Sequence, residues 1–522
     1  MRCLEPTAAP LLYLQVKMRL YLKITVLVFI LLFSSCIHKD YKSSTLVIGI
    51  EGSPTNLDPR YATDAFSEQI AMLSFNGLMR YTNNGRIVPD LARAINIKNN
   101  TTIDIILKRN IRFQDGTYFS AADVAATINS IIHGKEYSPY TEAFLHIKYI
   151  SISNPFNLVI HLTEPYAPIL SALTLGILPA KYAEDKNITL KNLIGTGPYK
   201  LVDYRQAKYV KLEANKYYSN GKPRISTLIF KIIPNDLTRV LELEKGSIGL
   251  LVNSVPPDSV KSLMKVKQLK VIVGAGNNYE YVGFNMRDPL LKIKKVRQAI
   301  AYAINRNDII RYVLFNLAEP ATGILPPWNW AYTSDVDIYP YEPSKAKSLL
   351  DQAGYPLNHG YRFTLTYKTS NNPLSVRIAQ TIAYELGQIG IKIILMPYEW
   401  GTFYNDIRHS NFQMYSLRWV GVMDPDIFYY AFDSKSVPPY GANRGYYINP
   451  DMNQLLETAR TILKRDKALA LYGSVQRLAA KDLPYVSLWY MDDITVMNRR
   501  LHNFIPRRGG GYCGIEKAYL SD

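Results

Sequence analysis

Hydrophobic and polar positions alternate along the chain in blocks that predict an α/β fold. Residues 45–50 form an apolar run that predicts a buried strand, and the polar residues 51–59 that follow predict a loop. Residues 376–389 place apolar side chains at helical spacing between two strand-like runs, residues 361–367 and 391–396. A strand, a helix and a strand in this order predict two parallel strands joined by a crossover.

The rest of the chain continues this alternation of short strands, turns and helices. Residues 78–89 predict a hairpin that turns at Asn83-Asn84-Gly85. Ser120 predicts the N-cap of a helix, with Asp123 three residues later completing a capping box. Further strands are expected at residues 101–107, 158–162, 199–202, 210–212, 227–233, 279–283 and 414–419, helices over residues 164–175 and 296–304 and twice within 452–478, and a pair of strands within 485–496.

Composition and charge narrow the function. The 522 residues are 48% hydrophobic, which is enough for large cores, and Lys and Arg number 61 against 43 Asp and Glu. The basic residues are scattered among apolar positions, whereas a nucleic-acid footprint would be clustered, so we expect no nucleic-acid partner. The excess charge either forms a solvated basic surface or attracts anionic solutes or an acidic membrane surface.

The amino terminus has the layout of a secretory signal. Arg19 and Lys23 precede an apolar run over residues 24–33, and two serines and Cys36 follow it. We expect a signal peptide over residues 1–35. An uncleaved membrane anchor is the alternative, for which the apolar run is shorter than the roughly 20 residues of a span.

The end of this segment resembles a bacterial lipoprotein processing site. Phe33-Ser-Ser-Cys36 fits the pattern, although Phe33 stands where leucine is usual. The resemblance implies a lipidated Cys36 followed by a tether over residues 36–44, because acyl chains contribute about 0.8 kcal/mol per buried methylene to membrane binding. Met18 begins a better signal than Met1, so we expect it to be the functional start.

Cysteine and histidine usage excludes two kinds of site. The sequence has three cysteines, Cys3, Cys36 and Cys513. Removal of the signal and lipidation of Cys36 leave Cys513 without a second cysteine to form a disulfide. The seven histidines lie far apart, with no His/Cys cluster at ligand spacing. We therefore expect neither a disulfide nor a metal site nor a cofactor.

Several motifs resemble the extracytoplasmic solute-binding proteins of peptide- and nickel-type ABC transporters. Residues 113–124 match Phe-x-Asp-Gly-x-x-Phe-x-Ala-x-Asp-Val, and residues 195–199 read Gly-Thr-Gly-Pro-Tyr. Residues 281–306 contain Tyr-x-x-Phe-Asn and then Val-Arg-Gln-Ala-Ile-x-x-Ala-Ile-x-Arg. The resemblance implies an α/β, two-lobed periplasmic binding protein-like fold of class II, with lobe I over residues 45–75, 176–278 and 491–522, a small extra subdomain over 76–175, and lobe II over 279–490.

The same resemblance implies a ligand site between the two lobes. Trp400 stands where the family places a cleft aromatic, and Trp419 stands where members run an extended segment along a bound peptide. Main-chain bonds of this kind hold a peptide while its side chains vary. Further cleft residues that we expect are Asn253, Tyr140, Tyr281 and Asn285, for each of which a core or turn role is the alternative.

One position departs from the family pattern. Peptide-binding members typically carry an Asp three residues after this tryptophan to hold the peptide amine, and Val422 occupies that place. Either Asp424 or Asp426 has taken over this role, or the ligand has no free amine; the shortened spacing also resembles members that carry metal chelates. Asp424-Pro425-Asp426 is equally consistent with a helix N-terminus, and the two roles are compatible.

We therefore predict a monomeric, lipid-anchored solute-binding component of an ABC importer at the extracytoplasmic face of the membrane, and not an enzyme. It would capture oligopeptides and deliver them to the permease and ATPase subunits; a metal chelate or a modified or cell-wall peptide is the alternative ligand. A secreted glycan hydrolase is the alternative class, motivated by acidic pairs and aromatic content. Adjacent Asp492 and Asp493 would face opposite ways on a strand, which argues against their acting as the carboxyl pair of a glycan hydrolase. The sequence lacks Gly-x-Ser-x-Gly and His-Glu-x-x-His, which argues against serine and zinc hydrolases.

Overall fold

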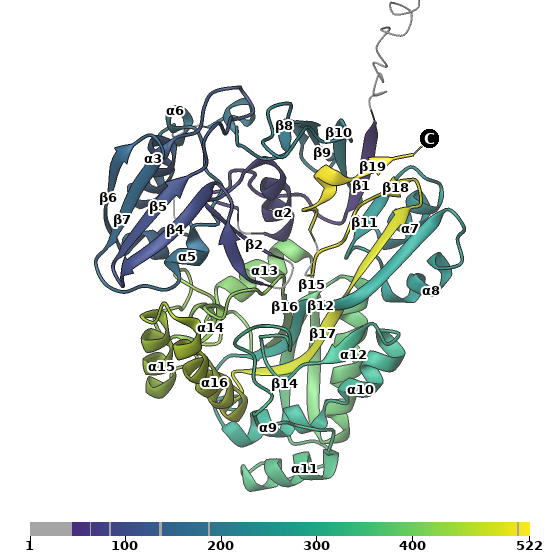
Figure 1. Ribbon diagram of the computed structural model, residues 1–522. Coiled ribbons are helices and arrows are strands. Elements are labelled where there is room, and N and C mark those ends of the chain that lie inside the picture. The colour runs from purple at the N-terminus through teal and green to yellow at the C-terminus, as the bar shows by residue number, and fades with distance from the viewer. Residues whose placement is uncertain are drawn as a thin grey trace, which may run out of the picture. The chain divides into compact units, whose positions relative to one another are not determined.

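A mixed sheet of eleven strands runs through the computed structural model, which describes residues 44–62, 64–82, 85–134, 138–185, 188–508 and 511–521. The strand order is β15-β14-β16-β12-β17-β11-β1-β10-β9-β8, and β13 pairs with β17 (Figure 1). The strands are β1 (Thr45–Ile50), β8 (Tyr199–Arg205), β9 (Tyr209–Ala214), β10 (Thr227–Ile232), β11 (Leu250–Val252), β12 (Leu269–Phe284), β13 (Ala318–Pro320), β14 (Phe363–Ser370), β15 (Ile391–Tyr398), β16 (Met414–Trp419) and β17 (Tyr485–Asn498). The predicted signal peptide and lipidation site lie outside the described residues.

The first sheet half consists of β1 and β8 to β11. β1 pairs in parallel with both β10 and β11, and its side chains Leu46, Ile48 and Ile50 are buried in a core that β8 to β10 share. Burial on both faces explains why this strand reads as a continuous apolar run. α7 (Asp236–Glu244) ends before Gly246, whose positive φ of 76° suits glycine. The loop after β1 leaves from the carboxyl end of the strand, as predicted.

The second sheet half consists of β14, β15 and β16. β14 and β15 are parallel, and α12 (Pro373–Gln388) crosses between them and buries Ile378, Ala379, Ile382 and Leu386, which confirms the predicted crossover. α9 (Lys294–Ala303) and α11 (Pro343–Gln352) pack onto the same core. α13 (Trp400–Arg408) lies between β15 and β16 in the chain.

Two long antiparallel strands, β12 and β17, run from one sheet half into the other (Figure 1). Their pairing shifts register between Gly274 and Asn278, so the predicted boundaries at 278/279 and 490/491 fall inside continuous strands and next to an irregularity. The predicted pair of strands within residues 485–496 is wrong. This segment is one strand, because the partner β12 absorbs the irregularity opposite Met491 and Asp493.

A separate four-stranded sheet, here called the small sheet, occupies the region predicted as the extra subdomain. Its order is β4-β5-β7-β6, and α3 (Ala121–Ile132) packs on its core behind the predicted capping box of Ser120 and Asp123. The helix predicted over residues 164–175 shrinks to α5 (Ile169–Ala172), because Pro168 lacks the N–H of a helix interior and disfavours helical geometry before it. The strands here are β4 (Ala92–Asn99), β5 (Thr102–Leu107), β6 (Ile147–Asn154) and β7 (Asn157–Leu162), with the predicted hairpin formed by β2 (Met79–Tyr81) and β3 (Ile87–Pro89).

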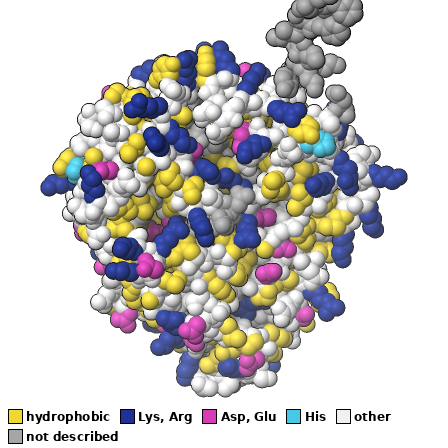
Figure 2. All heavy atoms as spheres, viewed as in Figure 1, with side chains coloured by type: hydrophobic (Ala, Val, Ile, Leu, Met, Phe, Trp, Pro, Cys, Tyr) yellow, Lys and Arg dark blue, Asp and Glu magenta, His cyan; other side chains and the backbone are white. Residues whose placement is uncertain are grey.

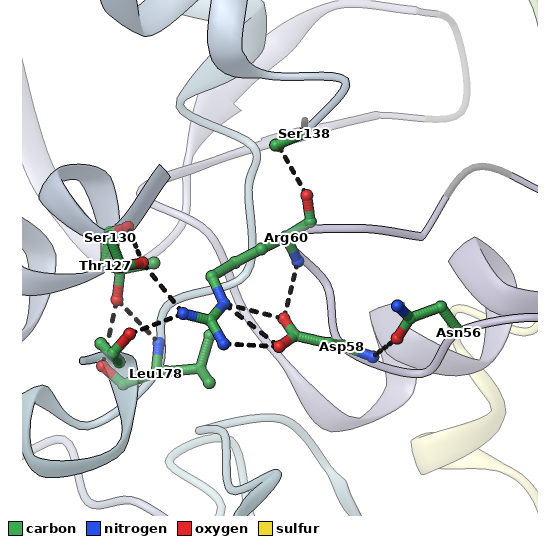
Figure 3. A network of polar contacts seen from close by, with 8 residues as sticks. Asn56, Asp58, Arg60, Thr127, Ser130, Ser138 and Leu178 are labelled. Carbon is green, nitrogen blue, oxygen red and sulfur yellow. Dashed lines mark hydrogen bonds and ion pairs between the residues drawn. The ribbon is translucent and has the colours of Figure 1, made fainter. Parts of the chain in front are cut away.

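A buried polar network ties the loop after β1 to α3 (Figure 3). Arg60 forms an ion pair with Asp58 at 2.6 Å and donates through Nη1 to Ser130 Oγ at 3.0 Å, while Ser138 Oγ donates to the Arg60 carbonyl at 2.6 Å. Both charged side chains are 4% exposed, so the pair is strong enough to fix the loop.

The remaining helices are distributed over the first sheet half, the small sheet and the second sheet half. They are α2 (Ala65–Ser74), α4 (Thr141–Leu145), α6 (Ala180–Ala183), α8 (Val260–Leu263), α10 (Arg306–Asp308), α14 (Ile427–Phe432), α15 (Pro450–Arg460) and α16 (Arg465–Asp482), with short helical turns η1 (Leu190–Asn192), η2 (Pro257–Ser259), η3 (Ile309–Val313) and η4 (Ile515–Lys517), and a last strand pair β18 (Leu501–His502) and β19 (Tyr519–Leu520). α15 and α16 are the two helices predicted within residues 452–478. Within the described part of the chain, no helix combines the length and apolar character needed to cross a bilayer.

Candidate ligand-binding site

Strand β16 has one edge that is only half used. It pairs with β12 from Met414 to Trp419, but with β14 only at Met414 and Tyr415. The backbone of residues 416–419 therefore has no strand partner on that side among the described residues. An edge of this kind can pair with another extended segment.

A group of aromatic side chains surrounds the end of β16. Tyr281 is fully buried and stacks on Tyr485 with ring centroids 4.0 Å apart and on Trp419 at 6.5 Å, while Tyr415 meets it edge-on at 5.8 Å. Gly283 allows the Tyr415 ring to lie in this position, since a Cβ at residue 283 would lie 2.5 Å from that ring. Burial raises the pKa of the Tyr281 and Tyr485 hydroxyls well above the ordinary value, so both stay neutral.

Arg444 lies inside this aromatic group. Its guanidinium carbon is 5.2 Å from the centre of the Trp419 ring and 5.7 Å from that of Tyr404. Toward the described residues, its side chain makes two hydrogen bonds, both long, from Nη1 to Tyr281 Oη at 3.4 Å and from Nη2 to Tyr404 Oη at 3.5 Å. We call Arg444 with Tyr281, Tyr404, Tyr415, Tyr485 and Trp419 the Arg444 cluster.

The Arg444 cluster reaches solvent through partly exposed aromatic side chains. Tyr430 is 45% exposed and meets Trp419 edge-on at 6.1 Å. Trp400 is 54% exposed and stacks on Tyr404 at 5.4 Å, so it joins the cluster through Tyr404 and not through Trp419. Trp419 therefore contacts Arg444 directly, and Trp400 is linked to it through Tyr404.

A set of charged residues brings the loop after β1 and strand β16 together. Arg418 of β16 forms an ion pair with Glu280 of β12 at 2.8 Å. Glu51, the first residue after β1, lies 3.6 Å from Arg239 of α7, and its charge also interacts with that of Arg418. The face of the molecule drawn in Figure 2 carries more Lys and Arg than Asp and Glu side chains, with several basic side chains around its middle.

The predicted acids Asp424 and Asp426 contact the small sheet region and α15. Asp424 accepts hydrogen bonds from Ser171 Oγ and, at 3.5 Å, from Tyr81 Oη, and its Oδ1 accepts from the backbone N–H of Asp426 at 2.9 Å. Asp426 pairs with Arg460 Nε at 3.0 Å. The turn precedes α14, as predicted, although Asp426 makes no side-chain cap bond.

The other predicted residues are distributed between this contact and the backbone. Tyr140 is half-buried at the start of α4, and burial together with the charge of Glu68 raises its pKa. Asn253 has a positive φ of 53°, and its Nδ2 donates to Asp493 at 2.8 Å where β11 meets β17. Asn285 lies in the turn after β12. Its side-chain Nδ2 donates to the backbone carbonyls of Ser410 and Phe412, which precede β16.

Sequence patterns did not predict Arg444, Tyr404 or Arg460. One signal was available: Arg444 is the single charged residue between Lys435 and Asp451, in a stretch rich in tyrosine, glycine and proline. A lone charge in such a stretch is either exposed or has a specific partner. Arg460, by contrast, lies in an ordinary amphipathic helix, and nothing in its spacing marks its partner.

A cavity of about 350 Å³ lies next to the Arg444 cluster, between β17, α14 and α16. Tyr485 and Phe432 line it on the cluster side, and Arg306 donates through Nε to the Ser487 carbonyl at 2.7 Å on its wall. Within the described residues, no group of three or more His, Cys, Asp or Glu side chains is arranged to hold a metal ion.

Comparison with known proteins identifies the family. Residues 86–439 match the model of the bacterial extracellular solute-binding proteins, family 5. The oligopeptide-binding protein AppA of Bacillus subtilis is 28% identical over 512 residues, which cover 92% of this chain and 93% of AppA. The structure of AppA in complex with a nonapeptide superposes with a TM-score of 0.83 at 26% identity, covering 92% of this chain and 99% of AppA.

A second solved structure of similar likeness has a different ligand. NikZ from Campylobacter jejuni in complex with Ni(L-His) has a TM-score of 0.83 at 28% identity, and the match covers 90% of this chain and 97% of NikZ. These neighbours are binding proteins and not enzymes, and they confirm the predicted periplasmic binding protein-like fold. The chain belongs to the family 5 bacterial extracellular solute-binding proteins.

Proposed function

We propose that this protein captures oligopeptides between the first and second sheet halves and delivers them to the permease of an ABC importer. The unpaired edge of β16 at residues 416–419 carries this proposal, because a peptide backbone can pair with it as an added strand. The half-exposed ring of Tyr430, which contacts Trp419, and that of Trp400, which stacks on Tyr404, supply apolar surface for variable side chains. The similarity to AppA, which was solved with a nonapeptide, supports it.

The two sheet halves and the small sheet act in this proposal as lobes that close on the solute. β12 and β17 are the hinge strands, and the register shift at Gly274 and Asn278 is the place where they bend. Solute binds the closed form better than the open form and so shifts the population toward closure. Lipidation of Cys36 holds the receptor near its permease, and a Cys36→Ser variant should appear in the soluble fraction of cells.

A titration of the mature, delipidated protein with peptides of three to nine residues tests the proposal. The protein is unfolded and refolded beforehand to remove bound solute, and tryptophan fluorescence and calorimetry follow binding. We expect saturable binding that a tryptophan signal reports, because Trp419 lies at the proposed peptide edge. Flat titrations across peptides of varied sequence and length would contradict the peptide function.

A metal chelate is the second candidate ligand. NikZ, 28% identical over most of its chain, was solved with Ni(L-His), and Val422 provides no acid for a peptide amine. Binding of Ni(II)–histidine in the absence of any peptide binding would favour this alternative. The two ligand classes can be titrated against the same preparation.

A further inference from the structure

Five arginines among the described residues are buried, and Arg444 differs from the other four. Three of those four donate to carboxylates or backbone carbonyls: Arg60 to Asp58, Arg239 to Asp236 and the Ser254 carbonyl, and Arg297 to the carbonyls of Leu291, Lys292, Asp482 and Leu483. The fourth, Arg460, donates to the Tyr166 hydroxyl and forms an ion pair with Asp426, with Nε 3.0 Å from Oδ1. Arg444, 6% exposed, takes part in none of the ion pairs of the described residues and donates only to two tyrosine hydroxyls. The fold therefore leaves this one buried cation without an anionic or carbonyl acceptor.

The hydrogen-bonding capacity of Arg444 is largely unused. A guanidinium has five N–H donors, and two long bonds to Tyr281 and Tyr404 leave three without an acceptor among the described residues. Arginine cannot lose its proton to escape burial, and Tyr281 stays neutral because burial raises its pKa. The rings of Trp419 and Tyr404 offset part of the desolvation through cation–π contact, but they accept no conventional hydrogen bond.

A second donor in the same place also lacks an acceptor. The indole Nε1 of Trp419 is buried without a hydrogen-bond partner, and indole N–H is a donor only. Arg444 and Trp419 belong to one cluster, which solvent reaches beside the 45% exposed Tyr430. An anionic oxygen is the acceptor that such a group of donors fits, since a carboxylate accepts two parallel N–H bonds from a guanidinium.

We propose that the solute carries a carboxylate and that Arg444 binds it, with the Trp419 indole as a further donor. This inference rests on the proposed function for the location of the solute and adds the chemistry of one of its ends. A peptide offers a terminal carboxylate, and an amino-acid chelate of a metal offers the same group. The site thus selects its solute by the negative end.

A purely structural role for Arg444 and a carboxylate-binding role predict opposite effects of its replacement on the stability of the solute-free protein. If Arg444 only packs against aromatic rings, Arg444→Gln should lower the melting temperature of the solute-free protein, as removal of a satisfied buried arginine does. If Arg444 awaits a carboxylate, Arg444→Gln removes an uncompensated charge and should leave the melting temperature unchanged or higher. The same variant should lose solute binding.

The test compares matched ligands on matched variants. Refolded wild type, Arg444→Gln and the control Arg408→Gln are titrated with one peptide as the free acid and as the C-terminal amide. Arg408 is an exposed arginine in the last turn of α13 whose charge also acts on Tyr430, so its variant removes a neighbouring charge without emptying the cluster. We expect amidation to weaken binding about 10- to 100-fold in wild type and Arg408→Gln, and less than about 3-fold in Arg444→Gln.

Two results would overturn the inference. One is an equal penalty for amidation in wild type and Arg444→Gln, and the other is a solute-free Arg444→Gln protein that melts well below wild type. If neither form of the peptide binds, the proposed peptide function is wrong, and the comparison moves to Ni(II)–histidine against Ni(II)–histidinamide. A wild-type preference for the carboxylate form that Arg444→Gln abolishes supports the inference there, and any other result with these probes overturns it.

Discussion

Arg444 and Arg460 are two buried arginines of the second half of the chain, 6% and 8% exposed, and they have opposite surroundings. Arg460 pairs with Asp426 at 3.0 Å, donates to Tyr166 of the small sheet region, and accepts the N–H of Ala167 at its carbonyl at 2.7 Å. Arg444 lies over the rings of Tyr404 and Trp419, and within the described part of the chain the acceptors of its side chain are two tyrosine hydroxyls.

The surroundings of Arg460 are those of a contact within the protein, whereas those of Arg444 suit a contact with another molecule. The groups around Arg460 join the small sheet to α14 and α15, so they hold two parts of the chain together. Burying a charge is unfavourable unless an acceptor repays it, and at Arg460 the acceptor is in the chain. At Arg444 the described residues do not supply it, which is the reason to look for it in the solute.

Replacement of Arg460 should have the largest effect. Arg460→Met leaves the buried Oδ1 of Asp426 without its partner, and we expect a loss of about 3–5 kcal/mol in the free energy of unfolding. Urea unfolding of the solute-free protein measures it. The double variant Arg460→Met/Asp426→Leu removes both charges and should recover most of the loss; a single variant as stable as wild type would show that the pair contributes little.

Glu385 shows a third way to bury a charged group, and its effect should be the next largest. Glu385 of α12 is 9% exposed, and burial, opposed by the N–H of Asn305, raises its pKa from 4.5 to about 7. Because the folded state holds this proton more tightly than the unfolded state, the contribution of Glu385 to stability falls as pH rises from about 4.5 to about 7 and is constant above.

The variant Glu385→Gln isolates this contribution. We expect Glu385→Gln to gain about 2–3 kcal/mol over wild type between pH 5 and pH 8, measured as the difference between urea unfolding curves at each pH. A carboxyl group can keep its proton when no partner is present, whereas Arg444 cannot discharge. A difference between the two proteins that stays flat with pH would show that Glu385 is ionised in the fold.

The contact of Asp424 with Ser171 and Tyr81 should matter less than the Arg460 pair. Asp424→Asn and Ser171→Ala each remove a charge-assisted hydrogen bond across this contact, and we expect each to cost about 1–2 kcal/mol in unfolding free energy. The double variant should lose less than the sum, because both residues serve one bond.

The same pair of variants tests whether Asp424 holds a peptide amine. In that case Asp424→Asn would weaken binding of peptides with a free amino terminus far more than binding of their N-acetylated forms, and Ser171→Ala would not. If Asp424 only joins the small sheet to the second sheet half, the two variants should affect both peptide forms alike.

Much of the fold could be predicted from sequence because local rules dominate there. The α12 crossover, the Ser120 capping box and the buried β1 all follow from apolar spacing and turn residues. The single strand β17 could not be predicted, since its continuity depends on its pairing along the length of β12, which lies far away in the sequence.

The site was predicted in part, for a similar reason. Trp419 and Tyr281 were expected because motif resemblance marks positions along the chain. In the structure their rings stack on each other. Arg444 was missed because it stands out only by the lack of an anionic or carbonyl acceptor near its guanidinium among the described residues. That lack is a property of tertiary structure and is not visible in the sequence. Asn285 could not be separated from a turn residue by sequence: its Oδ1 accepts the Arg287 N–H at 3.1 Å, as in a turn, while its Nδ2 donates to the distant carbonyls of Ser410 and Phe412.

Tyr404→Phe should have the smallest effect and bears most directly on the difference between Arg444 and Arg460. The variant keeps the ring over which Arg444 lies but removes the hydroxyl that accepts from Nη2 at 3.5 Å, so the solute-free protein should lose about 0.5 kcal/mol or less. A carboxylate that replaces this weak acceptor makes the hydroxyl dispensable, so the Kd for a carboxylate solute should change less than about 3-fold. Calorimetry on Tyr404→Phe beside Arg444→Gln measures both. A loss of affinity in Tyr404→Phe as large as in Arg444→Gln would mean that the solute binds the tyrosine hydroxyl, and the unpaired guanidinium would then be a cost that the fold bears for packing alone.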